Sequence, residues 1–229
     1  KNNDFFFFKR SQPDMAINLL VDLVKTRLPK AYGYSPTDDI QVISPSRKGT
    51  TGVIELNKAL QEQLNPKNKL KQEVKSAVYT FREGDKIMQT KNNYDIVWSK
   101  DGEQGAGIYN GDIGKILSIS KQRMEVVISF DGRTAVYTFD MINQLELAYA
   151  VTVHKSQGSE FEAVIMPILG GFEKLYYRNL LYTAVTRAKK LLIIIGSEEV
   201  IARMVANNKR TNRYTCLTAM LRDEMKQHE

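Results

Sequence analysis

Apolar and polar positions alternate in two different ways along the chain, and each predicts its own kind of structure. Near both ends, short runs of β-branched or aromatic residues alternate with apolar stripes at helical spacing. The runs predict buried strands at residues 5–8, 40–44, 151–153, 161–168 and 191–195. The stripes predict helices at residues 16–24, 53–64 and 175–189. This β-α-β order is typical of an α/β protein with a parallel, doubly wound sheet.

Between about residues 83 and 145 the pattern changes to a period of two, which is typical of half-buried strands. Strands are expected at residues 84–90, 115–120, 124–130 and 133–139. Asn-Gly at 110–111 marks a turn, and Asp-Gly at 131–132 between two alternating runs predicts a β-hairpin. Several short strands with tight turns favour a small barrel that interrupts the α/β domain. Residues 92–107 are polar and contain three glycines, so we expect a mobile loop there.

A polar loop separates the strands expected at residues 151–153 and 161–168. Its sequence, His-Lys-Ser-Gln-Gly-Ser-Glu, places an imidazole, an ammonium, a hydroxyl, an amide and a carboxylate within a few residues. Loops at the edge of a parallel sheet are where α/β proteins bind ligands. This mixture of groups suits a surface that contacts both a nucleotide and a phosphodiester backbone.

Several segments carry a resemblance to a known family. TVHKSQGSEF, which starts at Thr152, and LLYTAVTRAKKLLIIIG, which starts at Leu180, resemble the fifth and sixth helicase motifs of superfamily 1, in the RecD (exonuclease V alpha-subunit) branch. GDKIMQTKNNYD and IYNGDIG resemble the insert of the same family. The resemblance implies a RecA-like parallel sheet, the second motor domain, over residues 1–82 and 146–229. It also implies an inserted small Src-homology-type β-barrel over residues 83–145.

The resemblance implies roles for single residues as well. Arg187 matches the arginine finger of the sixth motif, and Arg47 resembles the fourth-motif arginine that contacts the γ-phosphate of ATP. A planar, permanently charged guanidinium suits the charge that builds on the γ-phosphate oxygens during phosphoryl transfer. The residues that match the nucleotide-facing part of the fifth motif are Gln157, Gly158 and Glu160. Those that match its DNA-facing part are Thr152, His154, Lys155 and Ser156.

The role of the insert stays open. Lys91, Asn92, Asn93, Tyr94 and Trp98 combine a cation and amides with aromatic rings, which are the components of a groove for single-stranded nucleic acid. Asn92 and Tyr94 are therefore candidate contacts to DNA. Packing of Tyr94 and Trp98 on the barrel, with an insert that only braces the motor, fits the sequence at least as well.

The chain has neither a G-x-x-x-x-G-K-[ST] phosphate loop nor an acidic pair at a strand end to hold magnesium. It starts at Lys1 and enters an apolar run almost at once, so we expect a fragment of a longer protein. The resemblance implies an ATP-dependent 5′-to-3′ DNA helicase that acts on single-stranded DNA. ATP and Mg²⁺ would be bound mainly by the N-terminal half of that protein, and this fragment alone is expected to be inactive.

Two other readings remain at this point. One is a non-catalytic DNA-binding module with a motor-like shape. The other is an accessory subunit of an exonuclease V-type nuclease complex, or the helicase half of a conjugative relaxase. The sequence does not decide between a free helicase and these assemblies.

Composition does little to distinguish a helicase from these alternative interpretations. The net charge of +7 favours a polyanionic partner but also fits an ordinary basic surface. One cysteine and two histidines provide neither an internal disulfide nor a zinc cluster, so we expect no metal site of this kind and a reducing, cytoplasmic compartment. No apolar run approaches the length of a membrane helix. A helix is expected at residues 215–226 in a basic tail, whose role is left open.

Overall fold

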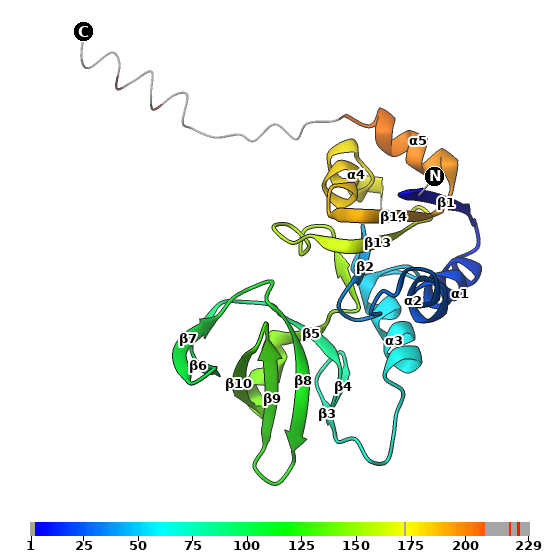
Figure 1. Cartoon of the computed structure of the whole chain (residues 1–229). Coiled ribbons are helices and arrows are strands. Elements are labelled where there is room, and N and C mark those ends of the chain that lie inside the picture. Colours follow the sequence, from blue (N-terminus) through cyan, green and yellow to red (C-terminus); the bar gives the residue numbers. More distant parts are fainter. Residues whose placement is uncertain (1–2, 172, 209–219, 221–223, 225–229) are drawn as a thin grey trace.

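The structure, a computed structural model, describes residues 3–171, 173–208, 220 and 224. It contains a parallel sheet covered by helices and an antiparallel barrel (Figure 1). The parallel sheet has the order β1-β14-β13-β2-β12, and all neighbouring strands in it run parallel. Its strands are β1 (Phe5–Lys9), β2 (Ile40–Ser44), β12 (Ala150–Thr152), β13 (Phe161–Ile168) and β14 (Ala188–Gly196). The predicted α/β sheet is therefore confirmed.

Helices cover both faces of this sheet because its strands are apolar on both sides. Along β13 and β14 alternate residues belong to opposite faces, Ile165 and Ile193 to one core cluster and Val164 and Ile194 to the other. The first cluster includes residues of α1 (Pro13–Asp22), α2 (Leu28–Tyr32) and α3 (Val53–Leu64), and the second includes residues of α4 (Arg178–Val185) and α5 (Glu198–Ala206). This burial holds the strand ends, and the loops that start from them, in fixed positions.

The first helical segment is longer than the sequence predicted. After α1 the chain continues through a π-helical turn (Leu23–Arg27) into α2. Pro29 does not end the helix: it lies just after the π-helical turn, whose wider hydrogen-bond pattern interrupts the regular α-helical ladder before it. Helix α4 (Arg178–Val185) is shorter than the predicted helix at residues 175–189. Arg187 therefore lies in the turn before β14.

No helix in the described part of the chain is long and apolar enough to cross a membrane. The helix expected at residues 215–226 lies outside the described residues, apart from Met220 and Glu224.

The barrel is a seven-stranded antiparallel sheet with the order β11-β5-β8-β9-β10-β6-β7. Its strands are β5 (Lys86–Gln89), β6 (Asn93–Lys100), β7 (Glu103–Ile108), β8 (Ile113–Ser120), β9 (Glu125–Phe130), β10 (Arg133–Thr138) and β11 (Leu145–Leu147). The turn between β9 and β10 has positive φ at Asp131 (51°) and Gly132 (79°), as the predicted tight hairpin requires. Two further strands, β3 (Glu73–Lys75) and β4 (Thr80–Arg82), pair with each other just before the barrel.

The prediction of a mobile loop at residues 92–107 is wrong, because most of this segment forms a hairpin of β6 and β7. The chain reverses at Asp101 and Gly102, where φ is positive at both residues (51° and 87°). A Cβ atom at Gly105 would lie 2.3 Å from the Trp98 ring on the paired strand, so only glycine lets the indole lie there. Two of the glycines that suggested mobility thus serve a tight turn and a close aromatic contact.

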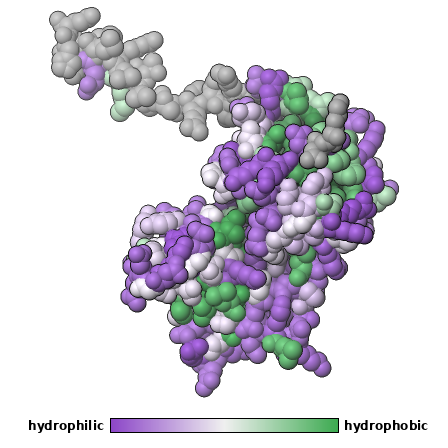
Figure 2. All heavy atoms as spheres, in the orientation of Figure 1, coloured by the Kyte–Doolittle hydropathy of each residue, from purple (hydrophilic) through white to green (hydrophobic). Residues whose placement is uncertain are grey.

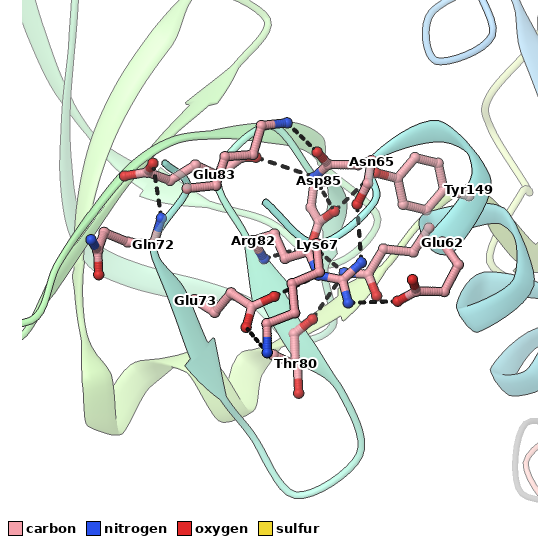
Figure 3. A network of polar contacts seen from close by, with 12 residues as sticks. Glu62, Asn65, Lys67, Gln72, Glu73, Thr80, Arg82, Glu83, Asp85 and Tyr149 are labelled. Carbon is pink, nitrogen blue, oxygen red and sulfur yellow. Dashed lines mark hydrogen bonds and ion pairs between the residues drawn. The ribbon is translucent and has the colours of Figure 1, made fainter. Parts of the chain in front are cut away.

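A buried carboxylate joins the two units. Asp85, just before β5, is fully buried and accepts four hydrogen bonds (Figure 3). The donors are Gln61 Nε2 (2.6 Å) and Asn65 Nδ2 (2.7 Å) near the end of α3, the Arg82 N–H (2.7 Å), and the Tyr149 hydroxyl (3.0 Å). Burial raises the pKa of the Asp85 carboxyl, and the four donors oppose that effect. The Asp85 side chain therefore ties the base of the barrel to the end of α3.

The next residue, Lys86, points to the other side of the strand and makes a second buried contact with the parallel sheet. Its Nζ donates to Gln41 Oε1 on β2 at 2.9 Å and lies 5.9 Å from the centre of the Phe161 ring. Burial lowers the pKa of Lys86 to about 8, although the carboxylates of Asp38 and Asp39 act in the opposite direction. Consecutive residues at the base of the barrel thus hold it to α3 and to β2.

Replacing Asp85 by alanine should lower the free energy of unfolding by about 2–4 kcal/mol, because four buried donors lose the acceptor they share. Urea denaturation of the chain measures this loss. Asp95→Ala, at an exposed position of β6, is the matched control and should change the value by less than about 0.5 kcal/mol. An unchanged unfolding curve for Asp85→Ala would show that the two units are held together elsewhere.

Lys86 should make stability depend on pH. Its pKa is about 8 in the folded chain and near 10.5 when unfolded, so between these values the unfolded chain binds more protons. The free energy of unfolding of the parent should therefore rise with pH in this window relative to that of Lys86→Met, by up to about 1.4 kcal/mol per pH unit. Urea denaturation of both proteins at a series of pH values checks this, and parallel pH profiles would contradict it.

Candidate nucleotide and nucleic-acid site

The loop between β12 and β13 folds into consecutive tight turns. The Ser156 N–H donates to Thr152 O, and the Ser159 N–H donates to Ser156 O, both at 3.1 Å. The Ser156 hydroxyl is buried and donates to a carbonyl within the turn at 2.8 Å, so the predicted DNA contact of Ser156 has no exposed hydroxyl to make it. Gly158 adopts a left-handed φ of +85°, which favours glycine even though there is space for a side chain.

This loop, residues 153–160, runs from one edge of the parallel sheet to the other. Thr152, just before it, is level with Ser44 at the carboxyl end of β2. Phe161, just after it, is level with Ala188 at the amino end of β14. The two ends of the loop therefore contribute to two different places on the surface, one at each edge of the sheet.

At the amino edge, Arg187 lies against the end of the loop. Its Nε donates to Thr183 O (3.1 Å), its Nη1 to Ser159 O (3.1 Å) and its Nη2 to the Thr186 hydroxyl (3.3 Å). No carboxylate forms an ion pair with Arg187 anywhere in the described ranges. The half-buried guanidinium is thus held by neutral oxygens, and these bonds use three of its five N–H groups.

The three residues predicted to face the nucleotide, Gln157, Gly158 and Glu160, are all exposed. Glu160 lies at the amino edge, because the next residue, Phe161, donates its N–H to Arg187 O at 2.9 Å. Glu160 also lines a cavity of about 350 Å³ whose wall includes Lys86 from the barrel. The structure therefore brings Glu160 and Arg187 together at one edge, with the base of the barrel beside them.

At the carboxyl edge, a groove of about 260 Å³ lies where the parallel sheet meets the barrel. Its polar lining is Arg47, Thr152 and Lys155 from the sheet unit and Thr90 and Glu146 from the barrel. Arg47 is exposed and pairs with Glu146 at 2.5 Å, and Lys155 Nζ donates to Thr90 O at 3.3 Å. Two cations and two hydroxyls along an open groove suit the phosphates of a nucleic-acid backbone.

The structure separates the two arginines that were predicted to reach one γ-phosphate. Arg187 precedes the amino end of β14, whereas Arg47 follows the carboxyl end of β2. From the register of β2, β13 and β14, these strand ends lie about 20 Å apart at about 3.3 Å per residue. Arg47 instead shares its groove with Thr152 and Lys155, which were predicted to contact DNA. His154, also predicted to contact DNA, is exposed in the loop just after Thr152.

Asn92 and Tyr94 are both exposed on the barrel. Asn92 Nδ2 donates to the Tyr94 hydroxyl at 3.0 Å, and the Tyr94 side chain remains 64% exposed. Trp98 behaves differently, because it packs on the barrel with the Arg133 guanidinium 5.8 Å from its ring. Packing on the barrel thus accounts for Trp98 but leaves Tyr94 unexplained.

Sequence reasoning missed three barrel residues at this groove: Thr90 and Glu146, which line it, and Asn110, which bonds to Lys155. Asn110 was predicted only as part of a turn, yet its side chain accepts a hydrogen bond from Lys155 Nζ. The family-like stretch IYNGDIG was the one signal available for it. Within the described residues, no group of three or more His, Cys, Asp or Glu side chains is arranged to hold a metal ion.

Two family descriptions match the chain. The SH3 domain of ATP-dependent RecD-like DNA helicases matches residues 56–130, which run from α3 to the end of β9. The UvrD-like helicase C-terminal domain matches residues 147–195, which include loop 153–160 and Arg187. The first match thus covers the barrel up to β9, and the second covers the loop 153–160 and the strands β12 to β14 of the parallel sheet.

Curated relatives point to the same family. The ATP-dependent RecD2 DNA helicase of Deinococcus radiodurans is 34% identical over 183 residues, which cover 80% of this chain and 23% of that protein. The RecBCD enzyme subunit RecD of Mycobacterium tuberculosis is 31% identical over 170 residues, which cover 74% of this chain and 27% of the relative. The chain therefore spans about a quarter of the length of these relatives.

Solved structures show the likeness of fold. A Pif1 helicase from Bacteroides, in complex with ADP-AlF3 and ssDNA, superposes with a TM-score of 0.50 at 16% identity, over 92% of this chain and 50% of that chain. Pif1 helicase from Candida albicans gives a TM-score of 0.50 at 16% identity, over 94% and 54%. The predicted RecA-like parallel sheet with a small SH3-like barrel inserted in it is confirmed. The chain belongs to the RecD-like branch of superfamily 1 helicases and carries their SH3-like barrel and helicase C-terminal domain.

Proposed function

We propose that this chain is the C-terminal motor half of an ATP-dependent 5′-to-3′ DNA helicase and that Arg187 is its arginine finger. The observation that carries the proposal is the setting of the Arg187 guanidinium. It is held by neutral oxygens at the loop that ends in Glu160, and no described carboxylate neutralises it. The 5′-to-3′ direction is carried over from the resemblance to the RecD branch.

The chemistry of Arg187 follows from this setting. Phosphoryl transfer places negative charge on the γ-phosphate oxygens, and a pre-positioned guanidinium stabilises that charge without reorganising. Glu160 would accept a hydrogen bond from the ribose, while Gln157 and the exposed backbone at Gly158 would approach the phosphates. Mg²⁺ would neutralise phosphate charge from the other domain.

ATP binding in this proposal depends on two domains. The sequence has no phosphate loop, so ATP and Mg²⁺ bind mainly to the N-terminal half of the same protein. Arg187 reaches the nucleotide only when the two motor domains close, which makes hydrolysis depend on closure. This chain alone should not turn over ATP.

Single-stranded DNA is proposed to lie in the groove at the carboxyl edge. Arg47, Thr152 and Lys155 line this groove, and His154 is exposed nearby. The separation of about 20 Å from the level of Arg187 favours a DNA phosphate, rather than the γ-phosphate, as the partner of Arg47. Contacts to phosphates carry no sequence information, which suits a motor that moves along any sequence. Alternate closing and opening of the ATP cleft would move the two domains along the strand.

The barrel contributes one wall of the groove, so we propose that it belongs to the DNA-binding surface. We keep its limits at residues 83 and 145 as a proposal, although β11, which pairs with β5, runs on to Leu147. On the face shown in Figure 2 the surface is mostly hydrophilic, and its hydrophobic residues lie in separate patches on the parallel-sheet unit and on the barrel. A polar, charged partner such as DNA fits that surface better than a broad protein interface.

A second candidate is a subunit of an exonuclease V-type nuclease complex. The relatives named as RecBCD subunit RecD favour it. The same two edges would then serve ATP and DNA within a larger assembly, and nuclease subunits would be partners. Co-purification of the full-length protein with other chains separates this candidate from a free helicase.

In the full-length protein, Arg187→Ala should lower kcat for ATP hydrolysis by about 10³-fold or more while leaving the affinity for single-stranded DNA unchanged. Arg187→Lys should recover only part of the rate, because an ammonium keeps the charge but not the planar fork. Steady-state hydrolysis at saturating DNA measures the effect, with Arg203→Ala on α5 as control. A near-normal kcat for Arg187→Ala would mean that the finger lies elsewhere.

Arg47→Ala and Lys155→Ala should each weaken DNA binding and reduce the slope of log K against log salt by about 0.7 for one lost phosphate contact. Their kcat at saturating DNA should stay within about twofold of the parent, because neither side chain lies at the nucleotide edge. Lys121→Ala, in an exposed turn of the barrel, serves as control for the loss of one charge. A fall in kcat for Arg47→Ala with an unchanged salt slope would instead assign Arg47 to the nucleotide.

A further inference from the structure

Two exposed tyrosines form a pair on the barrel that no packing role explains. Tyr94 is 64% exposed and Tyr109 is 44% exposed. Their ring centres lie 5.9 Å apart at an interplanar angle of 72°, an edge-to-face arrangement. In this geometry the edge of one ring meets the face of the other, so ring faces remain open to solvent. Large aromatic rings left in water are more informative than single exposed aliphatic residues.

The backbone is built to hold this pair in place. Tyr94 lies on β6, and Tyr109 directly follows β7. Gly107 has φ of +99°, and a Cβ atom there would lie 2.8 Å from the Tyr109 hydroxyl oxygen, so glycine makes room for the ring. The Tyr109 N–H donates to Asp112 Oδ2 at 3.1 Å, and the Tyr94 hydroxyl accepts from Asn92 Nδ2 at 3.0 Å.

Hydrogen bonds connect the tyrosine pair with the groove at the carboxyl edge. Asn92, which holds Tyr94, accepts from the Asn110 N–H at 2.9 Å. Asn110, the neighbour of Tyr109, accepts in turn from Lys155 Nζ, a residue that lines the groove. The exposed Lys91 adds a cation beside Asn92. The aromatic pair therefore continues the proposed phosphate-binding surface instead of standing apart from it.

We infer that Tyr94 and Tyr109 form a stacking platform for the bases of single-stranded DNA that leaves the groove. This inference rests on the proposed function, because the groove has to bind the DNA backbone first. Every base has a flat face, so stacking on tyrosine tolerates any sequence, and nearby cations hold the backbone. Asn92 and Asn110 orient the platform relative to Lys155. The insert is thereby assigned a direct part in binding DNA, and Tyr109 joins the DNA-binding residues.

The test uses the full-length protein without nucleotide and a fluorescent single-stranded oligonucleotide long enough to reach from the groove onto the barrel. Tyr94→Ala/Tyr109→Ala should raise Kd about tenfold and leave the salt slope unchanged, because stacking is not ionic. Tyr94→Phe/Tyr109→Phe should bind nearly as the parent does. Tyr32→Ala/Tyr34→Ala is the matched control. It removes another tyrosine pair, whose ring centres lie 5.4 Å apart and which does not belong to the barrel.

A stacking-sensitive base analogue in the oligonucleotide gives a second readout. Its fluorescence should be quenched by the parent protein and by the double phenylalanine variant, and not by the double alanine variant. Equal Kd and equal quenching for parent and double alanine variant would overturn the inference. Binding of a proline-rich or other peptide to the tyrosine pair, with DNA binding unchanged, would overturn it as well. If Lys155→Ala also leaves DNA binding and its salt slope unchanged, the proposed DNA-binding role of the groove is contradicted. That outcome tests the proposed function separately from the stacking platform.

Discussion

A buried carboxylate needs donors, and all four donors to Asp85, a residue at the base of the barrel, come from outside the barrel. A buried polar group left without a partner costs about 1–3 kcal/mol, and a charged one costs more. Asp85 can stay buried only while the end of α3, the Arg82 backbone and Tyr149 keep their places around it. Hydrogen-bond geometry at Asp85 therefore helps to fix the orientation of the barrel on the parallel sheet, together with the contact of Lys86 to β2.

Helix α3 connects Asp85 with the groove at the carboxyl edge. Its first turn bonds back to the loop of Arg47, with the Ile54 N–H donating to Arg47 O at 3.2 Å. Its other end supplies two of the donors to Asp85, and a helix of twelve residues is stiff along its axis. Arg47 then returns to the barrel through its ion pair with Glu146. Barrel, α3 and the Arg47 loop thus form a closed ring of contacts, in which the barrel cannot tilt without moving the groove.

The parts of this arrangement that depend on neighbouring residues could be predicted from the sequence. Apolar runs predicted the strands of the parallel sheet, and Asp-Gly at 131–132 predicted the β9–β10 hairpin. In both cases nearby residues decide the backbone conformation. The contact between Arg187 and loop 153–160 follows from two motifs on adjacent strands, β13 and β14. The sequence thus predicted that Arg187 and this loop lie together, although it did not predict Lys86 in the cavity beside Glu160.

Features that depend on distant contacts could not be predicted in the same way. The resemblance implied a γ-phosphate contact for Arg47, whereas only the fold shows that Arg47 shares a groove with Thr152 and Lys155. Ser156 sits in a polar motif, yet tight turns bury its hydroxyl. The glycines in residues 92–107 suggested mobility. The reason for Gly105, the Trp98 ring on the neighbouring strand, becomes visible only when the two strands are paired. The groove of Arg47 and the contact of Trp98 with Gly105 depend on strand pairing, whereas the burial of the Ser156 hydroxyl depends on the exact turn that the loop adopts.

The short loop between the two edges bears most directly on how such a chain could work as a motor. Eight residues, 153–160, separate Thr152 at the carboxyl-edge groove from Phe161 at the amino edge, and hydrogen bonds within the loop fix its turns. Arg187 holds this loop at Ser159 O, while Lys155 holds it to the barrel at Thr90 O. Under the proposed function, a movement of Arg187 on domain closure would reach Lys155, which lines the groove, across only four residues. This path runs through the loop and not through the buried strands of the sheet.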